Sequence, residues 1–372
     1  MSKLEQLINE LCPEGVEYRR LENCCEILDN KRKPVTKSAR EAGKYPYYGA
    51  NGIQDYISNY IFDGTFVLVG EDGSVVTEIG TPIVTWATGK IWVNNHAHII
   101  SEINGVLLRY LFHYLQTVPV KHLIHGNIPK LTGGDFRALK IAVPPLPVQE
   151  EIVRILDKFT ELTAELTAEL TARKQQYEYY RDRLFANYKS APKKKLIEVA
   201  DISRGIRVVK KQLISNGNYP VYQNSLAPMG YYDKYNCNGN TTYVISAGAA
   251  GEIGYCETNF WAADDCLFFS NLREINNKYI YYFLLTKQDF IYSNVRKASI
   301  PRLSRTVIEN LQIPIISIDE QEQVVNLLNR FDKLCNDISD GLPAEIEARQ
   351  KQYEYYRDKL LTFKKKEATE NE

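Results

Sequence analysis

The 372-residue sequence has no net charge, because 46 lysines and arginines balance 46 aspartates and glutamates. This balance argues against bulk, non-specific attraction to nucleic acid, which depends on an excess of basic residues. No apolar run approaches the about 18 residues of a membrane span, and the first residues lack the apolar segment of a signal peptide. We therefore expect a protein without a membrane part that stays in the cytoplasm.

Cysteine and catalytic motifs are also scarce. The seven cysteines are odd in number and show no CxxC spacing, which argues against a disulfide framework and a structural zinc site. GxxxxGK[ST], GxSxG, HExxH and GxGxxG are missing, as is the Asn/Asp-Pro-Pro-Tyr/Phe tetrapeptide of amino-methyltransferases. His96 and His98 have no third metal ligand nearby in sequence, so packing, hydrogen bonding or DNA contact is favoured over a metal site. We expect a recognition or scaffold chain, with no catalytic and no metal residues.

An internal repeat is the main positive feature. "QYEYYRD" at 176–182 recurs without change at 352–358, and "IPKL" at 128–131 matches "IPRL" at 300–303. Fainter matches align "KYPYYGAN" with "NYPVYQNS", and Trp92 with Trp261. Each half-chain therefore consists of a variable part followed by a closely repeated part.

The repeated parts have the pattern of long helices. Between 147 and 185 apolar residues recur at steps of three and four, without an interior glycine or proline. The second copy, from 319 to 361, is interrupted once at 339–347, where Pro343 is expected at the first position of a new helix. We expect the two helices to pair in antiparallel fashion. The residues expected to face the paired helix or a partner are Leu162, Leu166, Leu170, Tyr177, Tyr180, Tyr353 and Tyr356.

The variable parts have the pattern of α/β domains with more strand than helix. In the first half the strand-like runs "TFVLVG", "TPIVTWA" and "KIWVNNHAHII" precede the helical "VLLRYLFHYLQ", and the second half repeats this order. "GEDGS" has the composition of a plain turn. The predicted fold class is α/β, with two strand-rich domains separated and joined by the two repeat helices. The predicted segments are domain one at 1–145, a central helix at 146–188, domain two at 189–316, a distal helical region at 317–363 and a charged tail at 364–372.

Basic residues gather at matched places in the two halves, in "NKRKPVTKSAREAGK" (30–44), "SRGIRVVKK" (203–211) and "VRKASIPRLSR" (295–305). Such loops, followed by aromatic and amide residues, suit DNA, since cations hold phosphates and amides pair with adenine edges. The residues expected to contact the DNA backbone are Lys31, Arg32, Lys33, Lys37, Lys130, Arg204, Arg207, Lys210, Lys211, Arg296, Lys297 and Arg302. The residues expected at base edges are Tyr48, Asn51, Gln54, Asn94, Asn95, His96, Tyr222, Gln223 and Asn224.

The helical segments "EIVRILDKFTELTAELTAELTARKQQYEYYRDRL" and "LPAEIEARQKQYEYYRDKL" resemble the repeats of type I restriction-modification specificity subunits. The TAEL tandems resemble those of the type IC group. The resemblance implies two target-recognition domains, each reading one half of a bipartite DNA site, in a pseudo-two-fold arrangement. It also implies a helical spacer that docks two methyltransferase subunits, with a restriction subunit as a further possible partner. S-adenosylmethionine, Mg and ATP would belong to those partners, and adenine N6 methylation would be their chemistry.

The TAEL repeat predicts a ruler. One four-residue unit lengthens a helix by about 6 Å, so a gained unit should widen the gap between half-sites without changing them. Three other interpretations stay open: the specificity chain of a methylation-only system, a protein-binding scaffold without DNA, and a cryptic nuclease or methyltransferase. Zero net charge favours the scaffold.

Overall fold

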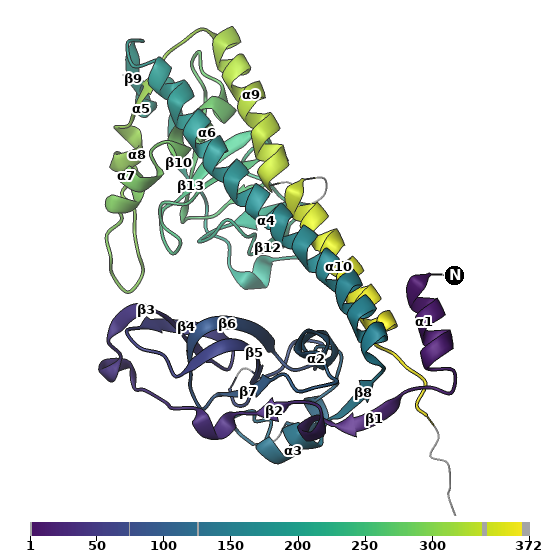
Figure 1. Cartoon of the computed structure of the whole chain (residues 1–372). Coiled ribbons are helices and arrows are strands. Elements are labelled where there is room, and N and C mark those ends of the chain that lie inside the picture. The colour runs from purple at the N-terminus through teal and green to yellow at the C-terminus, as the bar shows by residue number, and fades with distance from the viewer. Residues whose placement is uncertain (1, 74, 125, 337–340, 367–372) are drawn as a thin grey trace, which may run out of the picture. The chain divides into compact units, whose positions relative to one another are not determined.

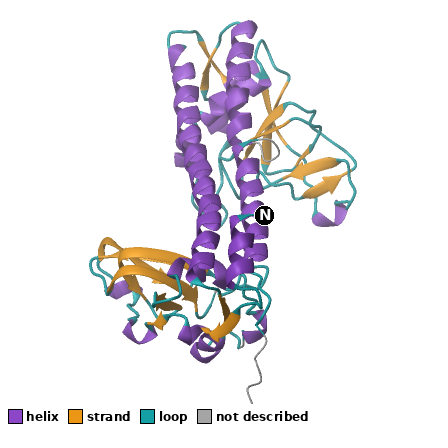
Figure 2. Cartoon of the chain, turned by 45° about the vertical axis from the view of Figure 1, so that its right-hand side comes forward, coloured by secondary structure: helices purple, strands orange, loops and turns teal. Residues whose placement is uncertain are grey.

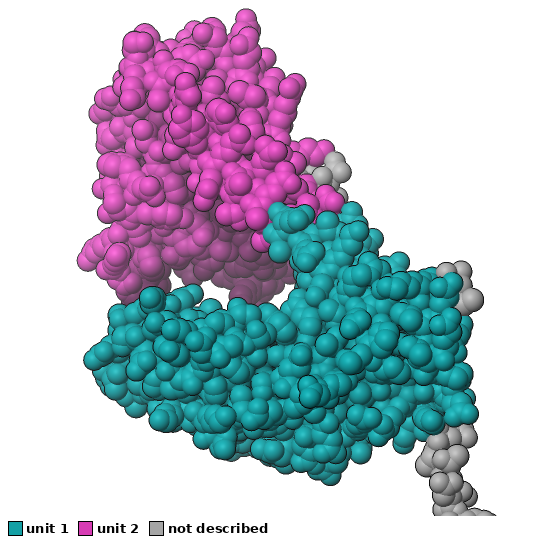
Figure 3. Space-filling view, viewed as in Figure 1, with its two compact units in different colours: residues 1–165, 346–372 teal, residues 166–345 magenta. Residues whose placement is uncertain are grey.

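The computed structural model describes residues 2–73, 75–124, 126–336 and 341–366. The chain forms two compact units (Figure 3): unit 1 contains residues 1–165 and 346–372, and unit 2 contains residues 166–345. The predicted segments 1–145 and 189–316 fall one into each unit. No helix among the described residues is both long and apolar enough to cross a bilayer.

One helix, α4 (Leu146–Asn187), contributes to both units (Figure 1), and its 42 residues confirm the long central helix. The division between the units falls at residue 165, inside the TAEL stretch. The first part of α4 therefore packs in unit 1 and the last part in unit 2.

The main sheet of unit 1 has six strands in the order β2-β7-β5-β6-β3-β4. All neighbours are antiparallel except β3 and β6. The strands are β2 (Glu26–Ile27), β3 (Ala42–Gly49), β4 (Gly52–Ile57), β5 (Phe62–Gly70), β6 (Val84–Val93) and β7 (Ala97–Ser101). A separate antiparallel pair is formed by β1 (Glu17–Arg20) and β8 (Lys140–Val143). The α-helices belonging wholly or mainly to this unit are α1 (Lys3–Leu11), α2 (Leu108–Leu115), α3 (Gly133–Ala138) and α10 (Leu342–Leu360).

Unit 2 distributes a similar set of strands over smaller sheets (Figure 2). Four strands have the order β10-β16-β13-β14, three have the order β12-β11-β15, and β17 pairs with β9. The strands are β9 (Lys193–Lys195), β10 (Asp201–Arg204), β11 (Tyr219–Tyr222), β12 (Gly230–Tyr232), β13 (Thr241–Ile245), β14 (Ile253–Cys256), β15 (Trp261–Ala262), β16 (Cys266–Ser270) and β17 (Gln312–Pro314). The helices are α5 (Leu196–Val199), α6 (Asn277–Leu285), α7 (Gln288–Ser293), α8 (Arg305–Glu309) and α9 (Ile318–Asn336). The α/β class is therefore confirmed.

The faint sequence repeat in the variable parts corresponds to a repeat in structure. Tyr47 in β3 pairs in parallel with Trp92, and Val221 in β11 pairs in parallel with Trp261. Each indole also donates to a backbone carbonyl, of Lys33 at 2.6 Å and of Ile206 at 2.7 Å. The alignment of the two tryptophans is confirmed.

The helices pair as expected inside each unit. In unit 1 the ring of Phe159 in α4 stacks on Tyr356 in α10 at a centroid distance of 5.3 Å, and α10 runs alongside α4 (Figure 1). In unit 2 the ring of Tyr180 in α4 stacks on Phe331 in α9 at 6.0 Å. These are the same two repeat positions, since Phe159 aligns with Phe331 and Tyr180 with Tyr356. The first "QYEYYRD" copy therefore packs in unit 2, and the second copy packs in unit 1.

The segment after α10 returns to the start of unit 1. The N–H of Val16 donates to the Lys364 carbonyl at 2.8 Å, and the N–H of Lys366 donates to the Val16 carbonyl at 3.0 Å. Gly15 has a φ of +107°, and a Cβ there would lie 2.6 Å from the Lys364 oxygen. Glycine is therefore required at this close approach. Residues 367–372 of the predicted charged tail lie outside the described residues.

Three local predictions need correction. "VTWA" and "KIWV" form the single strand β6 (residues 84–93), because Gly89, with a φ of +78°, lets the chain continue through "TGK" without a break. Residues 81–83 of the predicted run precede this strand. The residues "NNH" form the turn after β6, so His96 is outside any strand. Pro343 is the second residue of α10, not the first. The predicted break in the distal helix is confirmed by two helices, α9 and α10, although residues 337–340 are not described.

Candidate nucleic-acid interface

The "IPKL" and "IPRL" segments occupy equivalent places in the two units. Lys130 forms an isolated antiparallel bridge with Asp72, and Arg302 forms one with Ala247. The leucine that follows is buried in each unit, and its N–H donates at 2.8 Å to the first residue of the facing glycine-rich loop, Glu71 or Ser246. The predicted equivalence of Lys130 and Arg302 is therefore confirmed in position, whereas their contact with DNA stays a prediction.

The basic loop of unit 1 contains two kinds of cation. Lys31, Lys33 and Lys37 are exposed along the loop that links the short β2 to β3. Arg32 differs, because only 11% of its side chain is exposed. Its Nη1 lies 2.5 Å from Glu71 Oε2 and donates to the Ala97 carbonyl at 2.6 Å. The sequence predicts that Arg32, like its neighbours, contacts the DNA backbone. In the structure Arg32 instead fastens the loop to the sheet.

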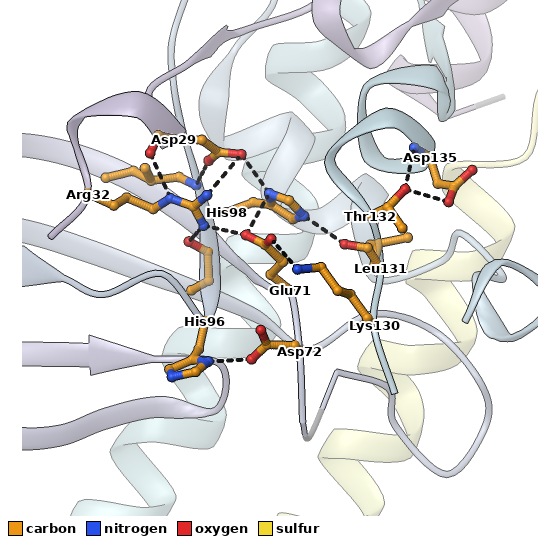
Figure 4. Close-up of polar contacts among 12 residues, drawn as sticks. Asp29, Arg32, Glu71, Asp72, His96, His98, Lys130, Leu131, Thr132 and Asp135 are labelled. Atoms are coloured by element: carbon orange, nitrogen blue, oxygen red, sulfur yellow. Dashed lines mark hydrogen bonds and ion pairs between the residues drawn. The ribbon is translucent and has the colours of Figure 1, made fainter. Parts of the chain in front are cut away.

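Arg32 belongs to a buried ion-pair network around His98 (Figure 4). His98 Nδ1 lies 2.7 Å from Asp29 Oδ2, and its Nε2 lies 3.0 Å from the Leu131 carbonyl oxygen. Both partners are acceptors, so both bonds form together only when the ring carries two protons. The ring also stacks on Phe136 at 4.2 Å. We call Asp29, Arg32, Glu71, His98 and Lys130 the His98 network.

Carboxylates of the network are held by cations. Burial alone would raise the pKa of Asp29, but the bond and charge of His98, the Ile99 N–H and the charge of Arg32 together lower it. Lys130 Nζ lies 3.1 Å from Glu71 Oε1. Lys130 is therefore paired within the chain, although 45% of its side chain is exposed.

The sequence shows no third ligand-type residue near His98, but the folded chain brings two carboxylates to it. Possible ligand atoms of Asp29, Glu71 and His98 lie within 4.8 Å of one another. The folded chain brings Asp29 and Glu71 from distant positions, which spacing along the sequence does not reveal. Because Arg32 donates directly to Glu71 and lies 3.6 Å from Asp29, these carboxylates already have a cation. The arrangement is that of an ion-pair network.

The β3–β4 hairpin presents the predicted amide side chains of unit 1. Asn51 at its tip and Gln54 on β4 are exposed. Ile53 and Tyr56 on the same strand are 46% and 51% exposed, and sequence reasoning missed both. A two-stranded ribbon of this kind fits the width of a DNA major groove.

The turn after β6 contains three residues predicted to contact base edges, and they differ in exposure. Asn95 is exposed, whereas Asn94 is 2% exposed. Asn94 Oδ1 accepts from the His96 N–H at 2.8 Å, and its amide donates to Gln54 Oε1 at 3.3 Å. His96, 47% exposed, pairs with Asp72 through Nδ1. Asn94 therefore shapes the turn, and the expectation that it contacts base edges is not supported by its burial.

The two tyrosines expected at base edges are packed in small cores. Tyr48 is 7% exposed among Phe62, Phe66 and Ile91. Tyr222 stacks on Tyr243 at 4.9 Å, and burial raises the pKa of Tyr222 to about 12. The two tyrosines occupy equivalent strands. Tyr48 serves packing because it faces inward, whereas Tyr222 is half-buried and packs against Tyr243.

Predicted residues of unit 2 converge on one cavity of about 510 Å³. Arg207 and Lys210 line it from the basic loop, and Gln223 and Asn224 line it from the loop after β11. The remaining lining residues include Ser225, Ala227, Pro228 and Met229. Arg204 and Lys211 are exposed nearby in sequence but do not line the cavity. Cations beside amides in a hollow give a surface suited to a phosphate with an adjoining base.

Arg296, Lys297 and Arg302 lie on one hairpin loop. Arg296 and Arg302 exchange two backbone hydrogen bonds, of 2.8 and 3.2 Å, which close the loop. All three side chains are exposed. The closed loop therefore brings together three cations that are spread over seven residues of sequence.

The two units are α/β modules built in the same way, and each carries exposed cations on loops held against a sheet. This is the architecture of a recognition protein with two similar domains. A model of the type I restriction modification DNA specificity domain matches the chain twice, over residues 13–173 and 189–348. The chain belongs to the type I restriction-modification specificity subunit family.

Relatives of known name agree with this assignment. A Haemophilus influenzae protein named as a type I restriction enzyme specificity subunit is 36% identical over 377 residues, covering 94% of this chain and 96% of the relative. The Escherichia coli EcoR124I/EcoR124II specificity subunit is 33% identical over 301 residues, covering 72% and 74%. The fold is similar to the crystal structure of a type I S subunit from M. genitalium, with a TM-score of 0.63, 16% identity and coverage of 93% and 96%.

Proposed function

We propose that each unit reads one half of a bipartite site in double-stranded DNA. The observation that carries this proposal is the repeated interface, in which Lys130 and Arg302 bridge to equivalent glycine-rich loops beside exposed cations. A helix common to both units, α4, is suited to set the separation of the half-sites. The exposed lysines and arginines supply phosphate contacts, and the β3–β4 hairpin and the loop after β11 supply base contacts.

Two methyltransferase subunits dock on the two "QYEYYRD" copies in this proposal. Tyr179 and Tyr180 are 59% and 40% exposed, and the matched Tyr355 and Tyr356 are 61% and 38% exposed. Exposed tyrosines on a helix are typical anchors of protein interfaces. The two "QYEYYRD" copies are identical, and Tyr179 and Tyr355 are exposed to a similar degree on them. One kind of partner can therefore be bound twice.

Catalysis belongs to the partners. The methyltransferase subunits would supply S-adenosylmethionine and transfer a methyl group to adenine N6, and a restriction subunit would use ATP and Mg. This chain contributes sequence choice, and it operates in the cytoplasm, where those subunits and the DNA are found.

The first test is a map of N6-methyladenine in the native host with and without this gene. Loss of one motif made of two short half-sites around a fixed gap is the expected result. Exchange of residues 1–145 or 190–316 for those of a relative should then change one half-site each. An unchanged map, together with no salt-dependent DNA binding by the purified complex, would favour the protein scaffold.

The docking faces are tested by co-purification with the methyltransferase subunits. Tyr179→Ala or Tyr355→Ala, which spare the stacked rings of Tyr180 and Tyr356, should each weaken the binding of one of the two subunits. Tyr56→Ala is the matched control, because Tyr56 is 51% exposed on the β3–β4 hairpin. Two subunits retained at full affinity by both variants would refute docking on these faces.

A further inference from the structure

Two isoleucines at equivalent positions are exposed at the matched junctions. Ile128 is 68% exposed and Ile300 is 54% exposed. Each is the first residue of its four-residue repeat and stands two residues before the cation, Lys130 or Arg302. Single exposed isoleucines are ordinary on a protein surface, but these two share one place in both units.

The loops hold these isoleucines at defined positions. The proline after each one accepts a backbone hydrogen bond from a glycine of the facing loop, from Gly73 at 2.9 Å and from Gly248 at 3.2 Å. The leucine three residues after each isoleucine is buried, Leu131 at 0% and Leu303 at 4%. Proline further restricts the backbone beside the exposed side chain. The apolar tip is therefore pre-positioned, which lowers the entropy lost on binding.

Charge indicates the chemistry of the ligand. No acidic residue occurs between 121 and 134, or between 294 and 308. The second stretch contains Arg296, Lys297, Arg302 and Arg305, the last paired with Glu309 at 2.5 Å. Ile300 lies in a loop with several cations, and Ile128 lies two residues before Lys130, whose ammonium also pairs with Glu71 of the facing loop. An exposed apolar side chain beside a cation, in a segment of its own without acids, fits a polyanion that also offers apolar surface. Duplex DNA has both, in its phosphates and in its base stacks and thymine methyl groups.

We propose that Ile128 and Ile300 are apolar wedges that press into the DNA of the two half-sites and partly unstack one base step each. This proposal rests on the proposed function, because it requires each unit to lie on DNA. Lys130 and Arg302 hold the phosphates beside the wedge. The free energy needed to bend or unstack DNA around an inserted isoleucine depends on the base sequence of the DNA. The wedges would therefore add selectivity without a base-edge hydrogen bond.

The experiment uses the complex of the full chain with its methyltransferase subunits and a duplex carrying the motif from the methylation map. Ile128→Ala and Ile300→Ala should each weaken binding about tenfold, because each removes a buried apolar contact. The dependence of affinity on salt should stay unchanged, since no phosphate contact is lost. Ile128→Leu and Ile300→Leu should retain most of the affinity. Ile79→Ala is the matched control, since Ile79 is 72% exposed on another loop of unit 1.

A second readout reports on the DNA. With 2-aminopurine placed in turn through each half-site, the wild-type complex should raise fluorescence at one step per half-site, and each alanine variant should abolish the rise in its own half only. Unchanged affinity and fluorescence in both alanine variants would overturn the wedge. So would loss of a methyltransferase subunit from these variants, which would identify the tips as protein contacts. Failure of the wild-type complex to bind the motif duplex would instead refute the proposed function.

Discussion

Gln149 and Gln321 make the same set of buried hydrogen bonds at the start of two different helices. The Oε1 of Gln149 accepts from the Leu107 N–H at 2.9 Å, and that of Gln321 accepts from the Asn276 N–H at 2.8 Å. Each Nε2 donates to two backbone carbonyls: Gln149 to Gly105 and Pro144, and Gln321 to Glu274 and Ile316. Both side chains are fully buried. Each glutamine therefore fastens a repeat helix to the domain before it.

Removal of either glutamine should destabilise its own unit. Gln149→Ala leaves one N–H and two carbonyls without their partner, so we expect a loss of about 2–4 kcal/mol in the free energy of unfolding. Gln321→Ala should have the same effect in unit 2. Hydrogen exchange measured along the chain will show which unit opens. The exposed neighbours, Glu150→Ala and Glu322→Ala, are the controls and should change stability by less than about 0.5 kcal/mol. Equal opening of both units in either glutamine variant would contradict this assignment.

The sequence shows that Gln149 and Gln321 are equivalent but not what they do. Helix periodicity predicts α4 nearly to its ends, because a 3.6-residue pattern without glycine is a local property. The N–H groups that the two glutamines accept from, those of Leu107 and Asn276, lie more than forty residues away, in segments without a motif. The same limit explains Tyr48 and Asn94, which were expected to contact base edges. Their burial depends on which strand faces which core, and this is set by pairing at a distance.

A buried histidine should make the stability of unit 1 depend on pH. His113 Nε2 lies 2.8 Å from Asp157 Oδ1, and its Nδ1 lies 2.9 Å from the hydroxyl of Tyr353 in α10. This geometry suits a neutral ring that donates to Asp157 and accepts from Tyr353. Burial lowers the pKa of His113 below 6.5, with the charges of Arg109 and Arg357 acting in the same direction, although Asp157 opposes the shift.

The unfolded chain therefore takes up the proton first as pH falls. The stabilising contribution of neutral His113 should be complete above about pH 6.5 and be lost as pH drops through the lowered pKa. Asp157, whose pKa is also lowered by His113 and Arg109 against its burial, should add a second loss below about pH 3.8. As pH falls below about 6.5, the melting temperature of the wild type should fall more than that of His113→Asn. Parallel pH profiles for the two proteins would refute this origin.

Arg32 and Lys33 are adjacent, but replacing Arg32 should lower stability, whereas replacing Lys33 should weaken DNA binding. Arg32→Ala removes a buried cation that pairs with both Glu71 and Asp29, 12% and 13% exposed, so we expect a loss of stability of about 3 kcal/mol. Lys33→Ala removes an exposed ammonium and should leave stability unchanged. It should weaken binding of the motif duplex and reduce the salt slope by about one. Urea unfolding and binding titrations at several salt concentrations separate the two. A reduced slope with normal stability for Arg32→Ala would show that Arg32 contacts DNA after all.

The TAEL stretch gives a prediction about length. Residues 160–172 are part of α4, and the division between the compact units falls among them at residue 165. One further TAEL inserted after Leu170 adds about 6 Å and about 40° of rotation to the helix. Since a base pair occupies about 3.4 Å of duplex length, the gap between half-sites should widen by about one or two base pairs.

Methylation maps of cells carrying the lengthened chain provide the measurement. The two half-site sequences should stay the same, because neither unit's interface includes residues of the insertion. Ala164→Gln with Ala168→Gln serves as the control, since both alanines are exposed and these changes alter composition while keeping the length. This control should leave the gap as it is in the wild type. A lengthened helix with an unchanged gap would mean that the separation of the half-sites is set elsewhere, and altered half-sites would mean that α4 itself takes part in reading the DNA.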